Sequence, residues 1–180
     1  VVVRVEARRL EQPARPRVVL VQALAKGDRD ELAVQAATEL GVDEIVPWQA
    51  ERSVSRWEGK ADKGIARWTT IVREAAKQAH RAWVPEVSAL ARTPDLVTRA
   101  AESRMLLLEP SADEPLSGLE FAADDREVVL VVGPEGGIAP TELSALTAAG
   151  ARAVRLGDTV LRTSTAGAAA LAVVSLRLAR

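Results

Sequence analysis

The chain has 180 residues, of which 48% are hydrophobic, and a formal net charge of −1, which together indicate a soluble globular protein with one substantial domain. The absence of cysteine and the single histidine exclude disulfide frameworks and thiolate metal sites, and they argue against a histidine-rich zinc site or a Ser-His-Asp triad. No apolar run approaches the roughly 20 residues of a membrane-spanning helix and no signal-peptide pattern opens the chain, so we expect a cytoplasmic protein without membrane contact and without a metal.

The start of the chain differs from the rest. Residues 1–5 are apolar except for one arginine and resemble a strand from a larger unit. Residues 7–17 are rich in arginine and proline and resemble a linker. We therefore interpret residues 1–16 as a remnant and linker that follows a missing N-terminal domain, and residues 17–180 as one domain.

In the first half of that domain, strand and helix patterns alternate. Residues 18–24 form an apolar run typical of a buried strand, a helix is expected at 28–40, and a short strand at 44–46. Such alternation is typical of α/β proteins with a mainly parallel sheet. The face of the 28–40 helix that we expect to be buried carries Leu32, Ala36 and Leu40.

A long helix is expected at residues 61–82, because apolar residues recur there at nearly 3.6-residue spacing. Arginine and lysine outnumber acids between residues 52 and 81, and a local basic surface can bind phosphate even in a chain of neutral net charge. A solvated helix surface is the alternative interpretation of the same charges. The expected apolar stripe consists of Ile65, Trp68, Val72, Ala75, Ala76, Ala79 and Trp83.

The second half continues the alternation, so the predicted fold is α/β, with a mainly parallel sheet flanked by helices. Residues 110–126, rich in acids, serine and alanine, are expected to form a surface connection. The further strands are expected at 104–108, 127–132 and 153–156, and the further helices at about 94–102, 140–149 and 163–178.

The strand predicted at 127–132 leads directly into a glycine turn, residues 133–137, with the sequence Gly-Pro-Glu-Gly-Gly. Ligands bind at the carboxyl ends of strands in open α/β sheets, so a site is expected here. Glycines permit positive φ and let backbone N–H groups approach a ligand closely. The turn matches neither G-x-x-x-x-G-K-[ST] nor G-x-G-x-x-G, which disfavours a P-loop ATPase and a Rossmann dehydrogenase. An ordinary strand-to-helix turn remains the alternative.

A second glycine-bearing segment follows the last predicted strand. It contains Gly157 and Arg162 and enters an alanine-rich helix at Thr163. Thr163 or Ser164 is expected to cap that helix by accepting a backbone N–H hydrogen bond. The small residues at 166–170 would let the helix pack very closely against another backbone, and a tightly packed core helix would explain them equally well.

These two segments resemble the signature of the RsmE-like family of SPOUT, or α/β-knot, methyltransferases. The resemblance covers about residues 18–176, and several ordered motifs are more specific than one glycine turn. The upstream segments that match the same family in order are Ala25-Lys26-Gly27-Asp28, Thr38-Glu39-Leu40-Gly41-Val42, Glu51-Arg52-Ser53, Glu74-Ala75-x-x-Gln78-x-x-Arg81 and Val84-Pro85.

The resemblance implies an S-adenosyl-L-methionine (SAM)-dependent enzyme that methylates N3 of a uridine in small-subunit (16S) ribosomal RNA. It also implies a C-terminal trefoil knot, a homodimer, and the ribosomal RNA or small ribosomal subunit as partner. The missing N-terminal domain would be PUA-like and RNA-binding, so we expect the chain alone to bind SAM but to have weak RNA affinity and little or no activity.

The same resemblance implies that SAM lies among three loops: the end of the 104–108 strand, the glycine turn, and residues 156–166. Main-chain groups would hold the adenine. The residues implied to bind the cofactor are Leu108, Glu109, Gly133, Pro134, Glu135, Gly136, Gly137, Leu156, Gly157, Leu161, Arg162, Thr163, Thr165 and Ala166.

Uridine N3 carries a proton and is a poor nucleophile at neutral pH, so transfer needs a base or cations that stabilise charge on the neighbouring carbonyl oxygens. Arg162 is the first candidate for that stabilisation, while Glu135 is either a base or a residue that orients the turn. The candidates for RNA contact are Arg52, Gln78 and Arg81, although a salt bridge to Glu74 or a neighbour would explain Arg81 as well.

Two other functions remain open. Another SPOUT RNA methyltransferase, acting on a ribose 2′-OH, is disfavoured by the upstream motifs. A nucleotide-binding or RNA-binding module without catalysis is the third hypothesis.

Overall fold

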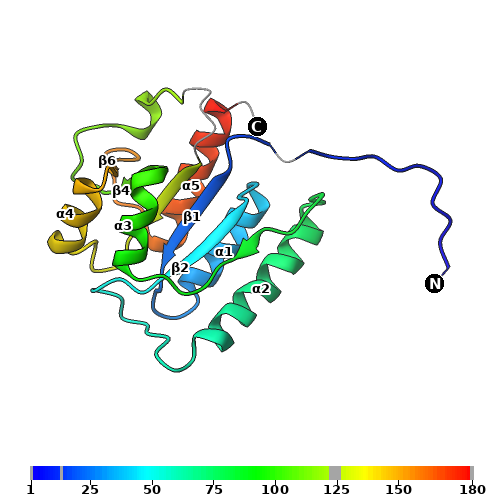
Figure 1. Ribbon diagram of the computed structural model, residues 1–180, viewed down its shortest axis with the longest axis horizontal. Coiled ribbons are helices and arrows are strands. Elements are labelled where there is room, and N and C mark those ends of the chain that lie inside the picture. The colour runs from blue at the N-terminus through cyan, green and yellow to red at the C-terminus, as the bar shows by residue number, and fades with distance from the viewer. Residues whose placement is uncertain (1, 13, 122–126, 179–180) are drawn as a thin grey trace.

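The computed structural model describes residues 2–12, 14–121 and 127–178. Within them lies one sheet of six parallel strands in the order β3-β2-β1-β5-β4-β6, flanked by helices (Figure 1). The predicted α/β fold with a mainly parallel sheet is therefore confirmed. The strands are β1 (Val18–Ala23), β2 (Glu44–Trp48), β3 (Glu86–Val87), β4 (Arg104–Leu108), β5 (Val128–Val132) and β6 (Arg152–Val154); the helices are α1 (Arg29–Glu39), α2 (Ala61–Gln78), α3 (Thr93–Glu102), α4 (Pro140–Ala148) and α5 (Thr163–Arg177), with a 3-10 turn η1 (Leu116–Gly118).

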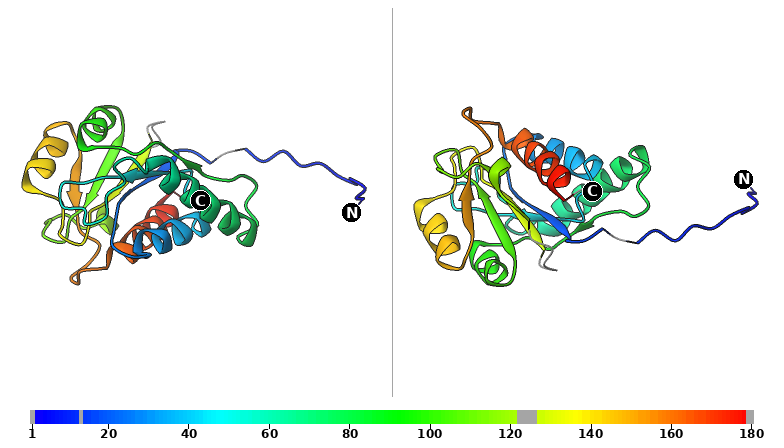
Figure 2. Two further views of the ribbon diagram at one scale, coloured as in Figure 1. Left: turned by 90° about the horizontal axis from the view of Figure 1, so that it is seen from below. Right: turned by 90° about the horizontal axis from the view of Figure 1, so that it is seen from above.

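The sheet is covered on both faces, which explains why its central strands are apolar throughout. Helices α1, α2 and α5 pack on one face and α3 and α4 on the other (Figure 2). Successive side chains of a strand alternate between the two cores, so Leu20 and Leu130 face α5 while Val21 and Val131 face α3 and α4. Because all strands are parallel, their carboxyl ends lie at one edge of the sheet, here called the carboxyl edge, and their starts at the opposite, amino edge.

The predicted buried face of α1 is wrong. Leu32 and Leu40 are 51% and 40% exposed, whereas Ala33, Val34 and Ala37 are fully buried. Helix α1 packs against both α5 and α2. Small side chains at these contacts permit close approach of the helices, so packing between helices, rather than the size of the apolar residues, selects the buried face.

Helix α2 buries the central part of its predicted stripe, including Trp68, whose ring meets the edge of Trp57 at 5.1 Å between centroids. The helix ends at Gln78 rather than near residue 82. His80 adopts a positive φ of 53°, and the N–H groups of His80 and Arg81 donate to the carbonyls of Lys77 and Ala76. This is a Schellman termination, in which a histidine takes the place usually held by glycine.

The connection predicted at 110–126 is only partly on the surface. Leu116 and Leu119 are buried in the core beneath α5, and Pro115 bridges to Arg155 beyond β6. Residues 122–126 of that prediction lie outside the described residues. The two-residue strand β3 was not predicted.

The described part of residues 1–17 forms no helix or strand, and its side chains are almost all exposed. The interpretation of residues 1–16 as a remnant of another domain stays a prediction, as does the trefoil threading of the C-terminal half. Among the described residues, no helix is both long and apolar enough to cross a membrane.

Candidate active site

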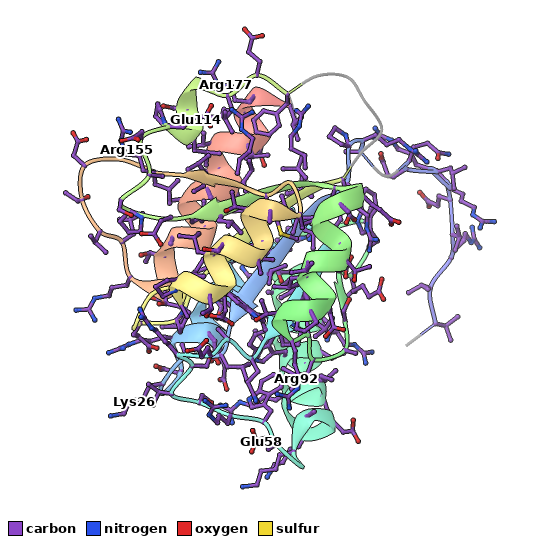
Figure 3. The ribbon with its side chains drawn as sticks, turned by 60° about the vertical axis from the view of Figure 1, so that its left-hand side comes forward. Lys26, Glu58, Arg92, Glu114, Arg155 and Arg177 are labelled. Carbon is purple, nitrogen blue, oxygen red and sulfur yellow. The ribbon has the colours of Figure 1, made fainter. Side chains whose placement is uncertain are left out.

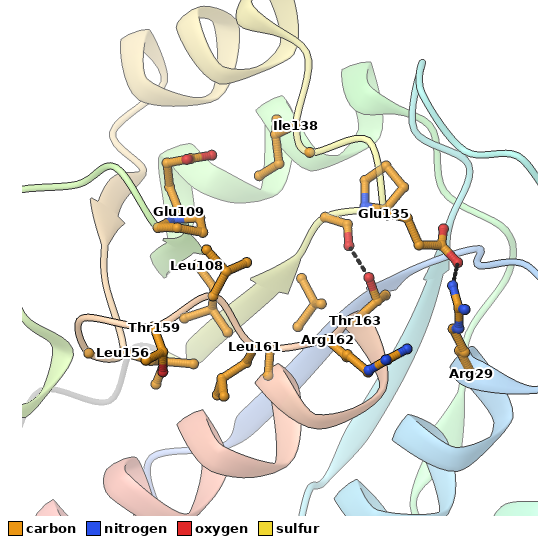
Figure 4. Close-up of a pocket in the computed structure, with 18 residues that line it drawn as sticks. Arg29, Leu108, Glu109, Glu135, Ile138, Leu156, Thr159, Leu161, Arg162 and Thr163 are labelled. Atoms are coloured by element: carbon orange, nitrogen blue, oxygen red, sulfur yellow. Dashed lines mark hydrogen bonds and ion pairs between the residues drawn. The ribbon is translucent and has the colours of Figure 1, made fainter.

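A cavity of about 460 Å³ opens at the carboxyl edge, between the end of β4, the glycine turn after β5 and the loop after β6 (Figure 4). The two glycine-bearing segments therefore meet, as the sequence predicts. Most residues that the resemblance implies for the cofactor line this cavity. They are Leu108, Glu109, Gly133, Pro134, Glu135, Gly137, Leu156, Gly157, Leu161, Arg162, Thr163 and Ala166.

Two of the implied residues, Gly136 and Thr165, are not part of the cavity lining. Gly136 lies under Arg52, whose Cβ would be 3.4 Å from a Cβ on the glycine. The hydroxyl of Thr165 donates to the carbonyl of Arg162 (3.2 Å) in the first turn of α5. Any contact of these two residues with a ligand stays a prediction.

The glycines of the cavity serve different purposes. A Cβ on Gly133 would lie 2.8 Å from Cγ1 of Ile138, so the fold itself requires glycine there. Gly137 has φ +73°, and its N–H donates to the carbonyl of Pro134 (2.9 Å), which closes the turn. By contrast, a Cβ on Gly157 would meet no protein atom within 4 Å, so packing within the described chain does not require a glycine at that place.

Thr163 connects the two loops instead of capping α5. The N-cap residue is Arg162, without a side-chain cap hydrogen bond. The hydroxyl of Thr163 lies 3.4 Å from the carbonyl oxygen of Gly133, a long hydrogen bond from the start of α5 to the glycine turn (Figure 4). The predicted cap is therefore wrong for Thr163, because the glycine turn offers its hydroxyl an acceptor.

Glu135 is held by the loop between β1 and α1. Its Oε1 accepts hydrogen bonds from the Lys26 N–H and from Nη1 of Arg29, each at 3.0 Å. Burial raises the pKa of Glu135, but its own N–H, the Lys26 N–H and the Arg29 guanidinium lower it further, so the net shift is downward. A carboxylate whose pKa is lowered and whose oxygen already accepts two hydrogen bonds is a weak base. This favours the orienting role for Glu135.

Arg162 projects into the cavity region, and no hydrogen bond or ion pair of its side chain is found in the described part of the chain. Figure 4 shows its guanidinium on the same side of the cavity as that of Arg29. Arg29 was missed by sequence reasoning, although it directly follows the Ala25–Asp28 motif. The other lining residues that were missed are Pro110, Val132 and Ile138, whereas Thr159 and Val160 belong to the predicted 156–166 loop without having been singled out.

The predicted RNA-contact residues lie at opposite ends of α2. Arg52 precedes the helix, at the carboxyl edge, and its Nη1 donates to the carbonyl of Gly136 (3.0 Å). Gln78 and Arg81 lie where the helix ends, at the amino edge. Nη1 of Arg81 donates to the carbonyls of Thr38 (3.1 Å) and Val42 (2.7 Å), at the end of α1.

Glu74, one of the partners that the alternative interpretation offers Arg81, pairs with Lys77 at 2.7 Å. Instead, the Arg81 guanidinium satisfies carbonyls at a helix terminus. RNA contact by Gln78 and Arg81 stays a prediction. The length of α2 separates these two residues from Arg52.

A family model described as an RNA methyltransferase domain matches residues 11–175. Ribosomal RNA small subunit methyltransferase E of Mycobacterium bovis is 51% identical over 93% of this chain and 66% of its own length. The protein of the same name from Bacillus subtilis is 34% identical over 88% of this chain and 65% of its own length. The chain thus spans just under two thirds of these relatives.

Among solved structures, the crystal structure of a Ribosomal RNA small subunit methyltransferase E from Neisseria gonorrhoeae bound to S-adenosyl methionine is similar, with a TM-score of 0.81 and 30% identity. The match covers 92% of this chain and 68% of that chain.

Proposed function

The chain belongs to the RNA methyltransferase domain family, and from this premise we propose that it is the catalytic domain of a SAM-dependent enzyme that methylates N3 of a uridine in 16S ribosomal RNA. The two named relatives are small-subunit ribosomal RNA methyltransferases, and the similar crystal structure is described as bound to S-adenosyl methionine. Bacterial ribosomal RNA is cytoplasmic, which is where we place the protein.

The single observation that carries the proposal is the cavity formed where the glycine turn meets residues 156–166. Its volume of about 460 Å³ falls in the usual range for small-molecule sites, about 300–1,000 Å³. Its walls combine apolar side chains with glycine backbone, and the space beside Gly157 is open. These features fit a bent nucleoside cofactor held through main-chain groups. When bound, SAM supplies an electrophilic methyl group.

The chain's own residues then have separate tasks. We assign Leu108, Leu156 and Leu161 to apolar contact with the cofactor, and the backbone of Gly133 and Gly157 to its polar groups. Arg162 would place positive charge beside the uracil carbonyl oxygens as N3 loses its proton, which lowers the cost of the developing negative charge. Glu135 would keep the glycine turn in position rather than take that proton.

A homodimer is part of the proposal, with α5 at its interface. The small residues of α5 are used partly within the chain, because a Cβ on Gly167 would lie 3.0 Å from Cδ1 of Leu20. The opposite side of α5 still carries Leu176, which is 83% exposed, and the adjoining loop carries Val160, which is 77% exposed. We propose that a second copy of the chain covers these two side chains.

Two measurements test the proposal. Calorimetry with SAM should give a saturable binding isotherm, and no binding would favour the RNA-binding module without catalysis. Primer extension on 16S ribosomal RNA, from a strain that lacks the natural activity and expresses the full protein, should stop at one uridine, because a methyl on N3 blocks base pairing. A ribose 2′-O-methyl product, which leaves base pairing intact, would identify the second SPOUT hypothesis instead.

A further inference from the structure

The glycine turn is also contacted by two arginines from different segments, of which Arg29 lines the cavity and Arg52 does not. Arg29, at the start of α1, donates from Nη1 to Oε1 of Glu135 (3.0 Å). Arg52, in the loop between β2 and α2, donates from Nη1 to the carbonyl oxygen of Gly136 (3.0 Å). Two segments that are far apart in the sequence thus each contribute one guanidinium, and the two guanidiniums contact consecutive residues of the turn, Glu135 and Gly136.

Both guanidiniums keep most of their hydrogen-bonding capacity. A guanidinium has five N–H donors, and the contacts found for Arg29 and Arg52 each use one nitrogen. The Arg29 side chain is 41% exposed, and Arg52 is exposed. Within the described ranges, Arg29 pairs with one carboxylate, that of Glu135, and Arg52 contacts a neutral carbonyl. These two side chains therefore present donors together with positive charge that is only partly neutralised.

The surroundings favour an anionic partner of extended shape. Lys26 lies in the loop that precedes Arg29, and Figure 3 shows it at the same edge of the molecule as Glu58 and Arg92. Arg162 extends toward Arg29 on the same side of the cavity (Figure 4). Two guanidiniums, those of Arg29 and Arg162, thus stand at one side of the cavity.

We propose that Arg29 and Arg52 bind two backbone phosphates of the RNA, on either side of the nucleotide that enters the cavity. This inference rests on the proposed function and assigns the residues that bind the RNA backbone at that same site. The planar fork of arginine matches phosphate in a bidentate manner. Because the glycine turn already fixes one nitrogen of each guanidinium, little side-chain entropy is lost when the phosphates bind. The glycine turn that lines the cavity thus also holds both arginines.

The test measures binding of in vitro transcribed 16S ribosomal RNA to the full protein by filter retention at several salt concentrations. Arg29→Ala and Arg52→Ala are compared with Arg73→Ala, an exposed arginine in the last third of α2, toward the amino edge. Each of the first two should weaken binding about fivefold to tenfold and make the slope of log K against log salt shallower by about 0.7, the value for one lost phosphate contact on single-stranded RNA. Arg73→Ala should change neither quantity.

A second readout separates RNA contact from support of the turn. SAM affinity, measured by calorimetry, should stay unchanged in Arg52→Ala, because Arg52 does not line the cavity. Arg29→Lys should restore most of the salt dependence because it keeps the charge. Unchanged salt slopes in both alanine variants, with or without a loss of SAM affinity, would overturn the proposal, and so would a wild-type chain whose RNA binding is insensitive to salt. Failure of the wild-type chain to bind SAM would instead count against the proposed function, while the salt slopes would still report on the arginines.

Discussion

Arginine side chains at the two edges of the sheet differ in how completely they are paired. At the amino edge, Arg99 donates to both oxygens of Glu44 (2.9 and 2.7 Å) and to both oxygens of Glu127 (2.6 and 2.9 Å). Glu44 also accepts from the Ser88 hydroxyl (2.5 Å) and lies 3.2 Å from Arg17. At the carboxyl edge, Arg29, Arg52 and Arg162 have at most one partner each within the described chain.

The difference shows where charge serves the fold and where it serves a ligand. A carboxylate as buried as Glu44, which is 5% exposed, is stable only when cations and hydroxyls replace its water. Guanidiniums left with spare donors beside a cavity contribute little to stability, but they can bind an anion. We therefore expect substitutions at the amino edge to change stability, and substitutions at the carboxyl edge to change binding and rate.

The largest effect is expected from Arg99→Ala, which leaves two carboxylates at the amino edge without their shared cation. Removing one partner of a largely buried network should lower the free energy of unfolding by about 3 kcal/mol in urea titrations. The control is Arg152→Ala, whose ion pair with Glu114 is at the surface and should be worth less than about 1 kcal/mol. Equal losses in the two variants would contradict the contrast between the edges.

Arg162→Ala should instead leave unfolding unchanged and lower the rate of methylation by the full protein. Loss of a cation that stabilises developing charge typically costs about 100-fold in kcat. SAM affinity, measured by calorimetry, should fall much less than kcat. The reverse pattern, a large loss of affinity with little change in kcat, would make Arg162 a cofactor ligand.

Two glycines sharpen the comparison within the cavity itself. Gly133→Ala should destabilise the protein by about 1–3 kcal/mol, because its Cβ would collide with Ile138. Gly157→Ala should leave stability unchanged, since its Cβ meets no protein atom, yet weaken SAM binding by about tenfold where a ligand fills that space. Thermal unfolding and calorimetry on both variants test the distinction, and unchanged SAM affinity in Gly157→Ala would place the cofactor elsewhere.

The pH dependence of stability should also differ between wild type and Glu44→Gln. Burial raises the pKa of Glu44, but hydrogen bonds from Arg99 and Ser88 and the nearby cations lower it further, to a net value below its usual 4.5. A group with a lowered folded-state pKa contributes stability above its unfolded pKa, and that contribution is lost as the pH falls through the folded value. Below a pH of about 4.5, wild type should lose stability more steeply than Glu44→Gln; parallel curves would show that Glu44 does not contribute.

The smallest expected effect is a gain in stability, also at the amino edge. His80 occupies the left-handed region at the end of α2, where glycine carries no Cβ penalty. His80→Gly should raise the free energy of unfolding by about 0.5–1 kcal/mol, with no change in SAM affinity. A loss of stability would show that the histidine side chain makes a contribution larger than the strain.

The sequence by itself determined the features that depend on neighbouring residues. The apolar runs at β1 and β5, the period of α2 and the glycine turn that ends β5 are local patterns, and steric and hydrogen-bonding rules translate them directly into elements. The meeting of the glycine turn with residues 156–166 was implied by the family resemblance. Several motifs of one family in the correct order then indicated the chemistry.

The tertiary structure alone decided which distant side chains meet. The pairing of Arg29 with Glu135, the placement of Arg52 on Gly136, and the use of Arg81 to satisfy the end of α1 all join residues from separate crossover units. No local pattern encodes these contacts, because they depend on the strand order and on how each helix packs against its neighbours. For the same reason, α1 buries its small residues and exposes Leu32.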